Sequence, residues 1–133
     1  MTMSACRPRY YALLAVAAAA LACTTAGVKD LAPVDAPALI QAPGTILIDV
    51  RTTAEYSAGH LQGARHMPLG EFGEAVDKMT EDKATPVVVY CRSGHRSGIA
   101  AGIMKGQGWT NVSNLQGGIN AWKAAGLPVT LDQ

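Results

Sequence analysis

Two short apolar segments rich in β-branched residues constrain the fold of this chain more than any other feature. They cover residues 46–50 and 87–90, and Pro86 directly precedes the second. Runs of this length and composition are typical of strands that are buried on both faces. Helical patterns occur at 72–79 and 97–105, so strands alternate with helices along the chain. This alternation predicts βαβ units and a parallel sheet with helices on both faces.

Weaker signals complete the pattern of an α/β domain. Further short strands are expected at 28–31, 64–67 and 112–115. Further short helices are expected to begin after Asp35, after Thr52 and at Asn120. The helix at 97–105 is expected to bury four apolar side chains: Ile99, Ala100, Ile103 and Met104. We also expect Trp109 and Trp122 to anchor the core, and His66 to lie at the surface.

The first residues of the chain have the composition of an export signal. Two arginines, Arg7 and Arg9, precede an uncharged segment from Tyr10 to Cys23, and within it Ala12 to Ala22 is unbroken apolar sequence that is mostly alanine. This run is shorter than the roughly 20 apolar residues that a membrane-spanning helix needs. We therefore interpret residues 1–22 as a signal peptide and expect an exported, periplasmic protein.

Cys23 is a candidate for lipidation. The stretch from Ala20 to Cys23 resembles a bacterial lipobox, in which the cysteine becomes the new N-terminus and carries lipid. Ordinary cleavage after Ala22 and an uncleaved N-terminal anchor are the alternatives. A lipid on Cys23 would attach the protein to a membrane and leave Cys91 as the one free thiol of the mature chain. A lone thiol cannot form an internal disulfide, so it serves either packing or chemistry.

The loop after the second apolar strand carries the candidate chemistry. Cys91 follows that strand directly, and the tight turn before the next helix points backbone N–H groups inward to form an anion-binding nest. Five loop residues are the candidate substrate-binding groups: Arg92, Ser93, Gly94, His95 and Arg96. The N–H groups and the helix dipole should lower the pKa of Cys91 and make its thiolate a nucleophile. An inert buried cysteine is the alternative, but it explains neither the loop glycine nor the two arginines.

Three motifs in this order resemble the single-domain rhodaneses. Residues 48–51, followed by Glu55-Tyr56 and the segment 59–64, are similar to the N-terminal signature of that family. The loop 91–96 is similar to its C-x-x-G-x-R active-site loop, and 117–122 resembles its C-terminal Gly-Gly…Trp signature. One departure is Gln62, which stands where the family usually has proline. The resemblance covers roughly residues 28–129.

The resemblance implies a three-layer α/β/α fold with a five-stranded parallel sheet, and sulfur transfer through a persulfide on Cys91. In the expected mechanism, the Cys91 thiolate attacks the outer sulfur of an anionic donor such as thiosulfate. Loop amides and the Arg92 guanidinium hold the donor and then the persulfide, until cyanide or a thiol removes the sulfur. No metal or cofactor is expected. Arg96 either binds the substrate or turns inward to pair with Asp49 and brace the loop, and we favour bracing.

Two other functions stay open at this point. Cysteine phosphatases hold phosphate in a loop with five residues between cysteine and arginine, whereas Cys91 and Arg96 have four between them. The smaller ring suits a persulfide better than a phosphoryl group, so phosphatase or arsenate reductase activity is the weaker alternative. The other alternative is a persulfide carrier or binding module for a partner protein.

The expected organisation is a signal peptide at 1–22, a linker at 23–27, one domain at 28–129 and a short tail at 130–133. The chain has 11 basic and 10 acidic residues, and loss of Arg7 and Arg9 would change its formal net charge from +1 to −1. This balance argues against binding to nucleic acid. We expect a monomer that meets a membrane only through its N-terminal anchor. Three residues are expected to support the active loop: Asp49, Arg51 and His60.

Overall fold

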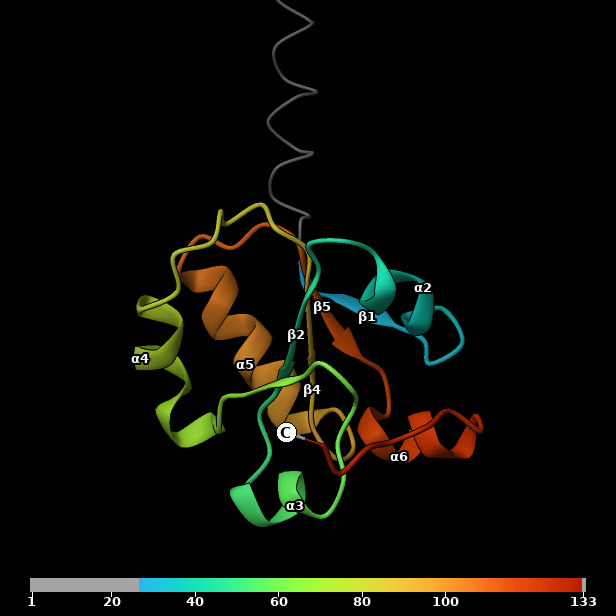
Figure 1. Cartoon of the computed structure of the whole chain (residues 1–133). Coiled ribbons are helices and arrows are strands. Elements are labelled where there is room, and N and C mark those ends of the chain that lie inside the picture. Colours follow the sequence, from blue (N-terminus) through green and yellow to red (C-terminus); the bar gives the residue numbers. More distant parts are fainter. Residues whose placement is uncertain (1–26, 133) are drawn as a thin grey trace, which may run out of the picture.

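The two apolar segments form neighbouring strands in the middle of a parallel sheet (Figure 1). The computed structural model describes residues 27–132. Its strands are β1 (Lys29–Leu31), β2 (Ile46–Asp49), β3 (Arg65–His66), β4 (Val87–Tyr90) and β5 (Val112–Leu115). They lie in the order β1-β5-β4-β2-β3, and every pairing is parallel. The expected five-stranded parallel sheet is confirmed, whereas the predicted signal peptide and Cys23 lie outside the described residues.

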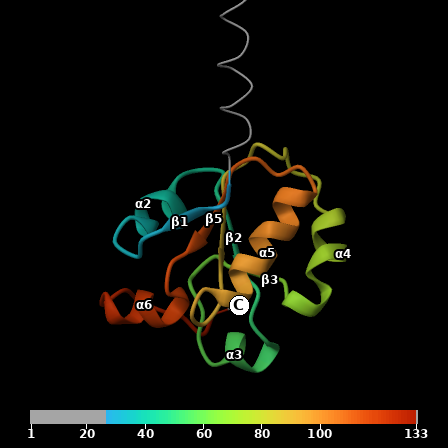
Figure 2. The ribbon, with the colours of Figure 1, turned by 180° about the vertical axis from the view of Figure 1, so that it is seen from behind.

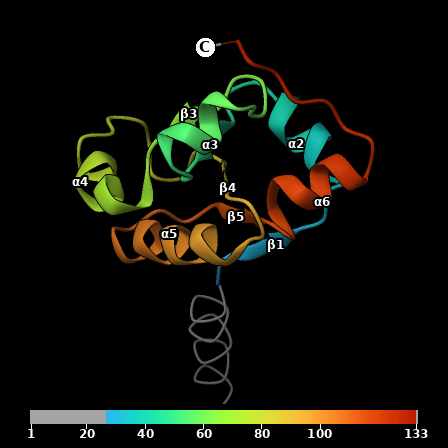
Figure 3. The same cartoon turned by 90° about the horizontal axis from the view of Figure 1, so that it is seen from below.

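Helices cover both faces of this sheet. The helices are α2 (Ala36–Gln41), α3 (Thr53–Ser57), α4 (Phe72–Asp77), α5 (His95–Gly106) and α6 (Gly118–Ala124), with a 3-10 turn η1 (Leu69–Glu71) before α4. Figure 3 shows α4 and α5 on one side of the sheet and α2 and α6 on the other. The structure therefore has the three-layer α/β/α architecture that was expected. Within residues 27–132, every helix is too short or too polar to cross a bilayer.

Each face of the sheet has its own apolar core because side chains alternate along a strand. Ile46 and Ile48 of β2 pack toward α4 and α5, whereas Leu47 between them packs toward α2 and α6. The strands β2 and β4 are thus buried on both faces, which explains why their sequences are almost entirely apolar. Trp109 belongs to the first core and Trp122 to the second, and both are buried as expected.

The first core corrects the predicted orientation of α5. Ser97, Ala100, Ala101 and Met104 form its buried face, at positions i, i+3, i+4 and i+7. Ile99 was expected to be buried, but it lies outside this stripe and is 48% exposed. The expected helix start at Ser97 is also two residues late, because Gly94 at φ = +103° already turns the chain into the helix.

Other element boundaries differ for similar local reasons. Helix α6 begins at Gly118 rather than Asn120, because Gly117 in the left-handed conformation turns the chain there. Asp35 stands at the N-cap position of α2, yet its side chain makes no capping hydrogen bond. Thr52 and Glu55 do form the expected capping box, which begins α3.

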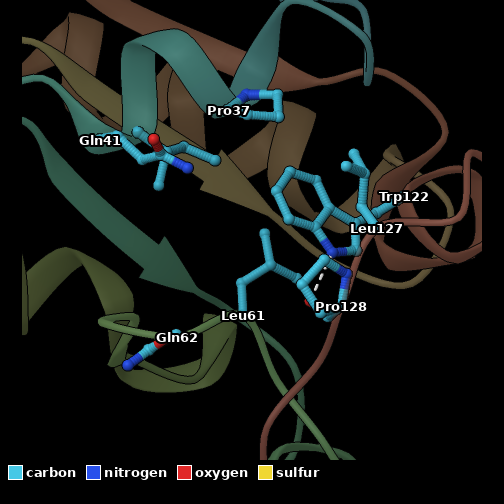
Figure 4. A pocket seen from close by; sticks show the side chains of 8 residues that line it. Pro37, Gln41, Leu61, Gln62, Trp122, Leu127 and Pro128 are labelled. Atoms are coloured by element: carbon cyan, nitrogen blue, oxygen red, sulfur yellow. Dashed lines mark hydrogen bonds between the residues drawn. The ribbon is translucent and has the colours of Figure 1, made fainter.

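An apolar pocket of about 290 Å³ lies on the face that α2 and α6 cover (Figure 4). Its lining residues are Pro37, Ile40, Gln41, Leu61, Gln62, Trp122, Leu127 and Pro128. The indole Nε1 of Trp122 donates a hydrogen bond to the Pro128 carbonyl oxygen at 2.8 Å, which joins α6 to the chain after it. None of the candidate loop residues 91–96 lines this pocket.

The corrected orientation of α5 predicts how two substitutions on the same helix differ. Met104→Ala should lower the free energy of unfolding by about 2–5 kcal/mol, because it removes a fully buried side chain and leaves a cavity. Ile99→Ala, the matched control, should cost less than about 1 kcal/mol because half of this side chain already meets water. Urea unfolding followed by tryptophan fluorescence measures both. Equal losses would contradict the observed helix orientation.

Candidate active site

The candidate loop lies at the carboxyl end of β4, the central strand of the sheet. Sites in open α/β sheets form at this edge, because the loops after parallel strands meet there. Figure 2 shows α3, the first turn of α5 and α6 gathered at the same end of the molecule. Cys91 follows Tyr90 directly and is the free cysteine of the described residues, with no exposed surface.

Hydrogen-bond donors surround the sulfur of Cys91. The backbone N–H of Gly94 donates to Sγ at 3.1 Å, and the hydroxyl Oγ of Ser97 lies 3.4 Å from Sγ. Burial alone raises the pKa of the Cys91 thiol, but the hydrogen bonds from Ser97, Gly94 and Ser93 outweigh it. The pKa is therefore lower than that of an ordinary cysteine, and the thiolate is favoured as the sequence predicts.

Glycines allow the backbone to close around this sulfur. Gly118, the first residue of α6, packs against the loop so closely that a Cβ there would lie 2.5 Å from the Cys91 carbonyl oxygen. The N–H groups of Ile119 and Asn120 donate to the carbonyl oxygens of Cys91 and Arg92, at 2.9 and 3.1 Å. The start of α6 therefore holds the first two residues of the loop from behind.

Arg96 braces the loop through a partner that the sequence did not predict. Its guanidinium makes two 2.8 Å hydrogen bonds to the carboxylate of Glu55 in α3. These bonds, together with those from Thr52, hold the pKa of Glu55 well below its usual range. The expected pairing of Arg96 with Asp49 is wrong, because Arg51 already occupies the Asp49 carboxylate.

The Asp49–Arg51 pair is buried at the end of β2, beside the active loop. Arg51 Nη2 lies 2.8 Å from Asp49 Oδ2 and also donates to the Gly59 carbonyl oxygen at 2.6 Å. The pair thus joins the end of β2 to the chain after α3. Leaving either charge alone in this buried place would be costly, since an unpaired buried ion loses its hydration.

Two histidines, His60 and His66, stack on the ring of Tyr56. His60 is buried, with Nδ1 2.9 Å from the Tyr56 carbonyl oxygen and Nε2 2.5 Å from that of Asp132. His66 was expected at the surface, but it is half-buried and its Nε2 lies 2.8 Å from the Arg51 carbonyl oxygen. Both rings join segments of the chain. Within residues 27–132, no group of three His, Cys, Asp or Glu side chains could hold a metal ion.

Arg92, Ser93 and His95 are the exposed side chains of the loop. Arg92 borders a polar cleft of about 270 Å³ between α3 and α6, beside the loop. The other lining residues are Arg51, Glu55, Ala58, Gly59, Ile119, Asn120 and Lys123. The loop therefore combines a buried, acidic thiol with an exposed arginine at the edge of a cleft. This combination can attract an anion and attack it with a thiolate.

Sequence reasoning did not assign a role to two buried polar residues behind the sulfur. Ser97 was treated only as the start of a helix, and Asn114 of β5 was not singled out. Ser97 Oγ lies 2.6 Å from Asn114 Oδ1, and Asn114 Nδ2 donates to the Gly94 carbonyl oxygen at 3.1 Å. The available signal was the polar pair Ser113-Asn114 inside the predicted strand 112–115.

Comparisons with known proteins agree with this arrangement. The Bacillus subtilis "Uncharacterized protein YqhL" is 41% identical over 76 residues, which are 57% of this chain and 59% of that protein. The chain thus spans less than two thirds of that relative's length. A protein named thiosulfate sulfurtransferase GlpE from Actinobacillus succinogenes is 36% identical over 100 residues, 75% of this chain and 88% of that protein.

Structural similarity and a family model lead to the same assignment. A rhodanese-related protein from Thermoplasma volcanium has a TM-score of 0.69 and 25% identity, and the match covers 78% of this chain and 99% of that structure. The model of the rhodanese-like domain matches residues 32–125, which is more than half of the chain and includes the whole Cys91 loop. This chain therefore belongs to the rhodanese-like family.

Proposed function

We propose that this protein is a sulfurtransferase that moves sulfane sulfur from thiosulfate, or a similar anionic donor, to cyanide or a thiol through a persulfide on Cys91. The observation that carries the proposal is the surroundings of the sulfur. Cys91 lies at the carboxyl end of the central strand, with the Gly94 N–H and Ser97 hydroxyl beside it and a lowered pKa. The relative named thiosulfate sulfurtransferase supports the same chemistry.

The first step is a displacement at sulfur. The Cys91 thiolate attacks the outer sulfur of thiosulfate, a new S–S bond forms, and the original S–S bond breaks so that sulfite leaves with its electron pair. In the second step, the cyanide carbon attacks the outer sulfur of the persulfide. Thiocyanate leaves, and Cys91 returns to the thiolate. Neither step needs a metal or an external oxidant.

The two arginines of the loop have different roles in this mechanism. Arg96 is committed to Glu55 and keeps the loop in place. Arg92 is exposed, and no side-chain hydrogen bond or ion pair holds it within the described residues, so it is the guanidinium that receives the anionic donor. The backbone N–H of Gly94 stays directed at the sulfur and stabilises the negative charge that the persulfide carries.

Substitution of the nucleophile tests the proposal directly. Cys91→Ala should reduce thiosulfate:cyanide sulfur transfer to the uncatalysed rate, because no other described thiol can form the persulfide. Cys23→Ala is the matched control and should retain the wild-type rate. Thiocyanate formation measures both.

Two outcomes would favour the alternatives instead. A wild-type chain that forms a persulfide but turns over with neither cyanide nor a thiol would be a carrier for a partner protein. A wild-type chain that shows no sulfur transfer but releases phosphate from an aryl phosphate would be a phosphatase. Either result would overturn the proposed activity.

A double-mutant cycle distinguishes bracing from donor binding by Arg96. If Arg96 acts only through Glu55, then Arg96→Ala, Glu55→Ala and the double variant should each lower kcat/KM by a similar factor, roughly ten- to a hundredfold, because the loop shifts. The exposed pair Arg65–Glu81 is the matched control, and Arg65→Ala should leave kcat/KM unchanged. A much larger loss for Arg96→Ala than for Glu55→Ala would place Arg96 in contact with the donor.

We also propose that the protein is exported as a monomer and anchored by lipid on Cys23, on the strength of the sequence of residues 1–23. Intact mass of the chain purified from membranes, before and after thiosulfate, tests the anchor and the persulfide together. The expected mass is that of a chain beginning at Cys23 with acyl groups, plus one sulfur after thiosulfate. A mature chain without acyl groups would contradict the lipid anchor. The persulfide would still be tested separately, by the mass of one sulfur added after thiosulfate.

A further inference from the structure

The side chains of Cys91, Ser97 and Asn114 form a connected row that leads inward from the sulfur. Ser97 Oγ lies 3.4 Å from Sγ and 2.6 Å from Oδ1 of Asn114. All three residues are buried: Cys91 directly follows β4, Ser97 is in α5 and Asn114 is in β5. Asn114 Nδ2 in turn donates to the Gly94 carbonyl oxygen at 3.1 Å. Asn114 therefore touches the active loop but does not touch the sulfur.

The hydrogen-bonding capacity of these groups determines where the Ser97 proton lies. Because the amide nitrogen of Asn114 is directed at a carbonyl oxygen, the amide oxygen is the atom that faces Ser97. An amide oxygen only accepts, and a serine hydroxyl has one proton to donate. The short 2.6 Å contact thus places that proton on the path to Asn114, and Ser97 presents a lone pair to Cys91.

We propose that Asn114 is a positioning residue that holds the Ser97 hydroxyl proton while Cys91 is a thiol and loses it when Cys91 becomes a thiolate. In the thiol state, Cys91 can donate its S–H to the Ser97 oxygen, and every group is satisfied. In the thiolate state, the hydroxyl must rotate to donate to the sulfur, and the buried Asn114 oxygen is left without that donor. Since an unsatisfied buried acceptor is costly, Asn114 opposes the thiolate.

This role of Asn114 extends the proposed function, and its benefit to the protein rests on that function. The N–H of Gly94 and the hydroxyl of Ser97 favour the thiolate, but a strongly stabilised thiolate is also a weaker nucleophile. By competing for the Ser97 proton, Asn114 keeps the sulfur reactive toward a donor. It does so without contact with substrate.

The charged and titratable groups around Cys91 come from its own loop and from the neighbouring elements. They are Arg92, His95 and Arg96 on the loop and α5, Asp49 at the end of β2, Arg51 after it, Glu55 on α3 and Lys123 on α6. Asn114 carries no charge, so replacing it with a neutral residue changes none of these. A shift in the titration of Cys91 after such a change therefore reports on the hydrogen bonds behind the sulfur.

The test measures the thiolate of Cys91 in the full-length chain without any need for sulfur transfer. Iodoacetamide alkylation is followed from pH 5 to 10, and the label is located on the tryptic peptide 84–92, which contains Cys91 and no other cysteine. Asn114→Ala should move the midpoint of this profile to lower pH and raise the alkylation rate at pH 6 by about three- to tenfold. Asn114→Asp should move it to higher pH, because a carboxylate both accepts the proton and repels the thiolate.

Three further variants make the result decisive. Ser97→Ala should move the midpoint to higher pH, and adding Asn114→Ala to Ser97→Ala should change nothing more, because the two residues act through one proton. Asn111→Ala, the same substitution near the other end of β5, is the control and should leave the profile unchanged.

Certain outcomes would overturn the role of Asn114. It is refuted if Asn114→Ala leaves the midpoint unchanged, moves it in the same direction as Asn114→Asp, or keeps its effect in the Ser97→Ala background. Shifts in one direction for both Asn114 variants would show that the residue only supports the loop. Absence of sulfur transfer in the wild type would refute the proposed activity but would not alter the alkylation profile.

Discussion

The tight turn that carries the chain from β4 around the Cys91 sulfur into α5 is the constraint on which the rest of the site depends. Gly94 makes the turn possible, since its φ of +103° is a conformation that other residues rarely adopt. The same turn directs the Gly94 N–H at the sulfur, at 3.1 Å. The shape of the loop and the lowered pKa of the thiol thus have one cause, because the backbone turn that directs the N–H group at the sulfur also favours the thiolate.

The turn is held from three sides by elements that are distant in the sequence. The start of α6 accepts no side chain at Gly118 and donates two backbone hydrogen bonds to the loop. Glu55 of α3 holds Arg96, and the capping box at Thr52 holds Glu55. The side-chain amide of Asn114 in β5 donates a hydrogen bond to the Gly94 carbonyl oxygen. The three supports are thus the backbone of α6, a partly exposed ion pair and a buried amide, and Cys91 itself also packs into the apolar core.

Sequence reasoning predicted the sheet and the loop because their signals are local. The β-branched segments 46–50 and 87–90 are too short and too apolar for surface helices, and Cys91 stands directly after the second of them, with the loop glycine three residues later. It misjudged the partner of Arg96, because Asp49 ends β2 and Glu55 follows closely after it, and only the folded structure shows that Arg51 already pairs with Asp49. Asn114 escaped notice for a related reason: a polar residue in a strand usually faces solvent, and here its strand is buried throughout.

The distribution of charge explains how a nearly neutral chain could recruit an anion. Its formal net charge is +1, so no overall field draws thiosulfate to the surface. Two of the arginines near the site, Arg51 and Arg96, are neutralised by carboxylates that they contact directly. Arg92 at the edge of the cleft forms no ion pair with any of residues 27–132, and it lies next to N–H groups that favour negative charge on the sulfur. Attraction for an anion is thus strongest beside the thiolate, because salt screens it beyond about 8–10 Å at physiological ionic strength.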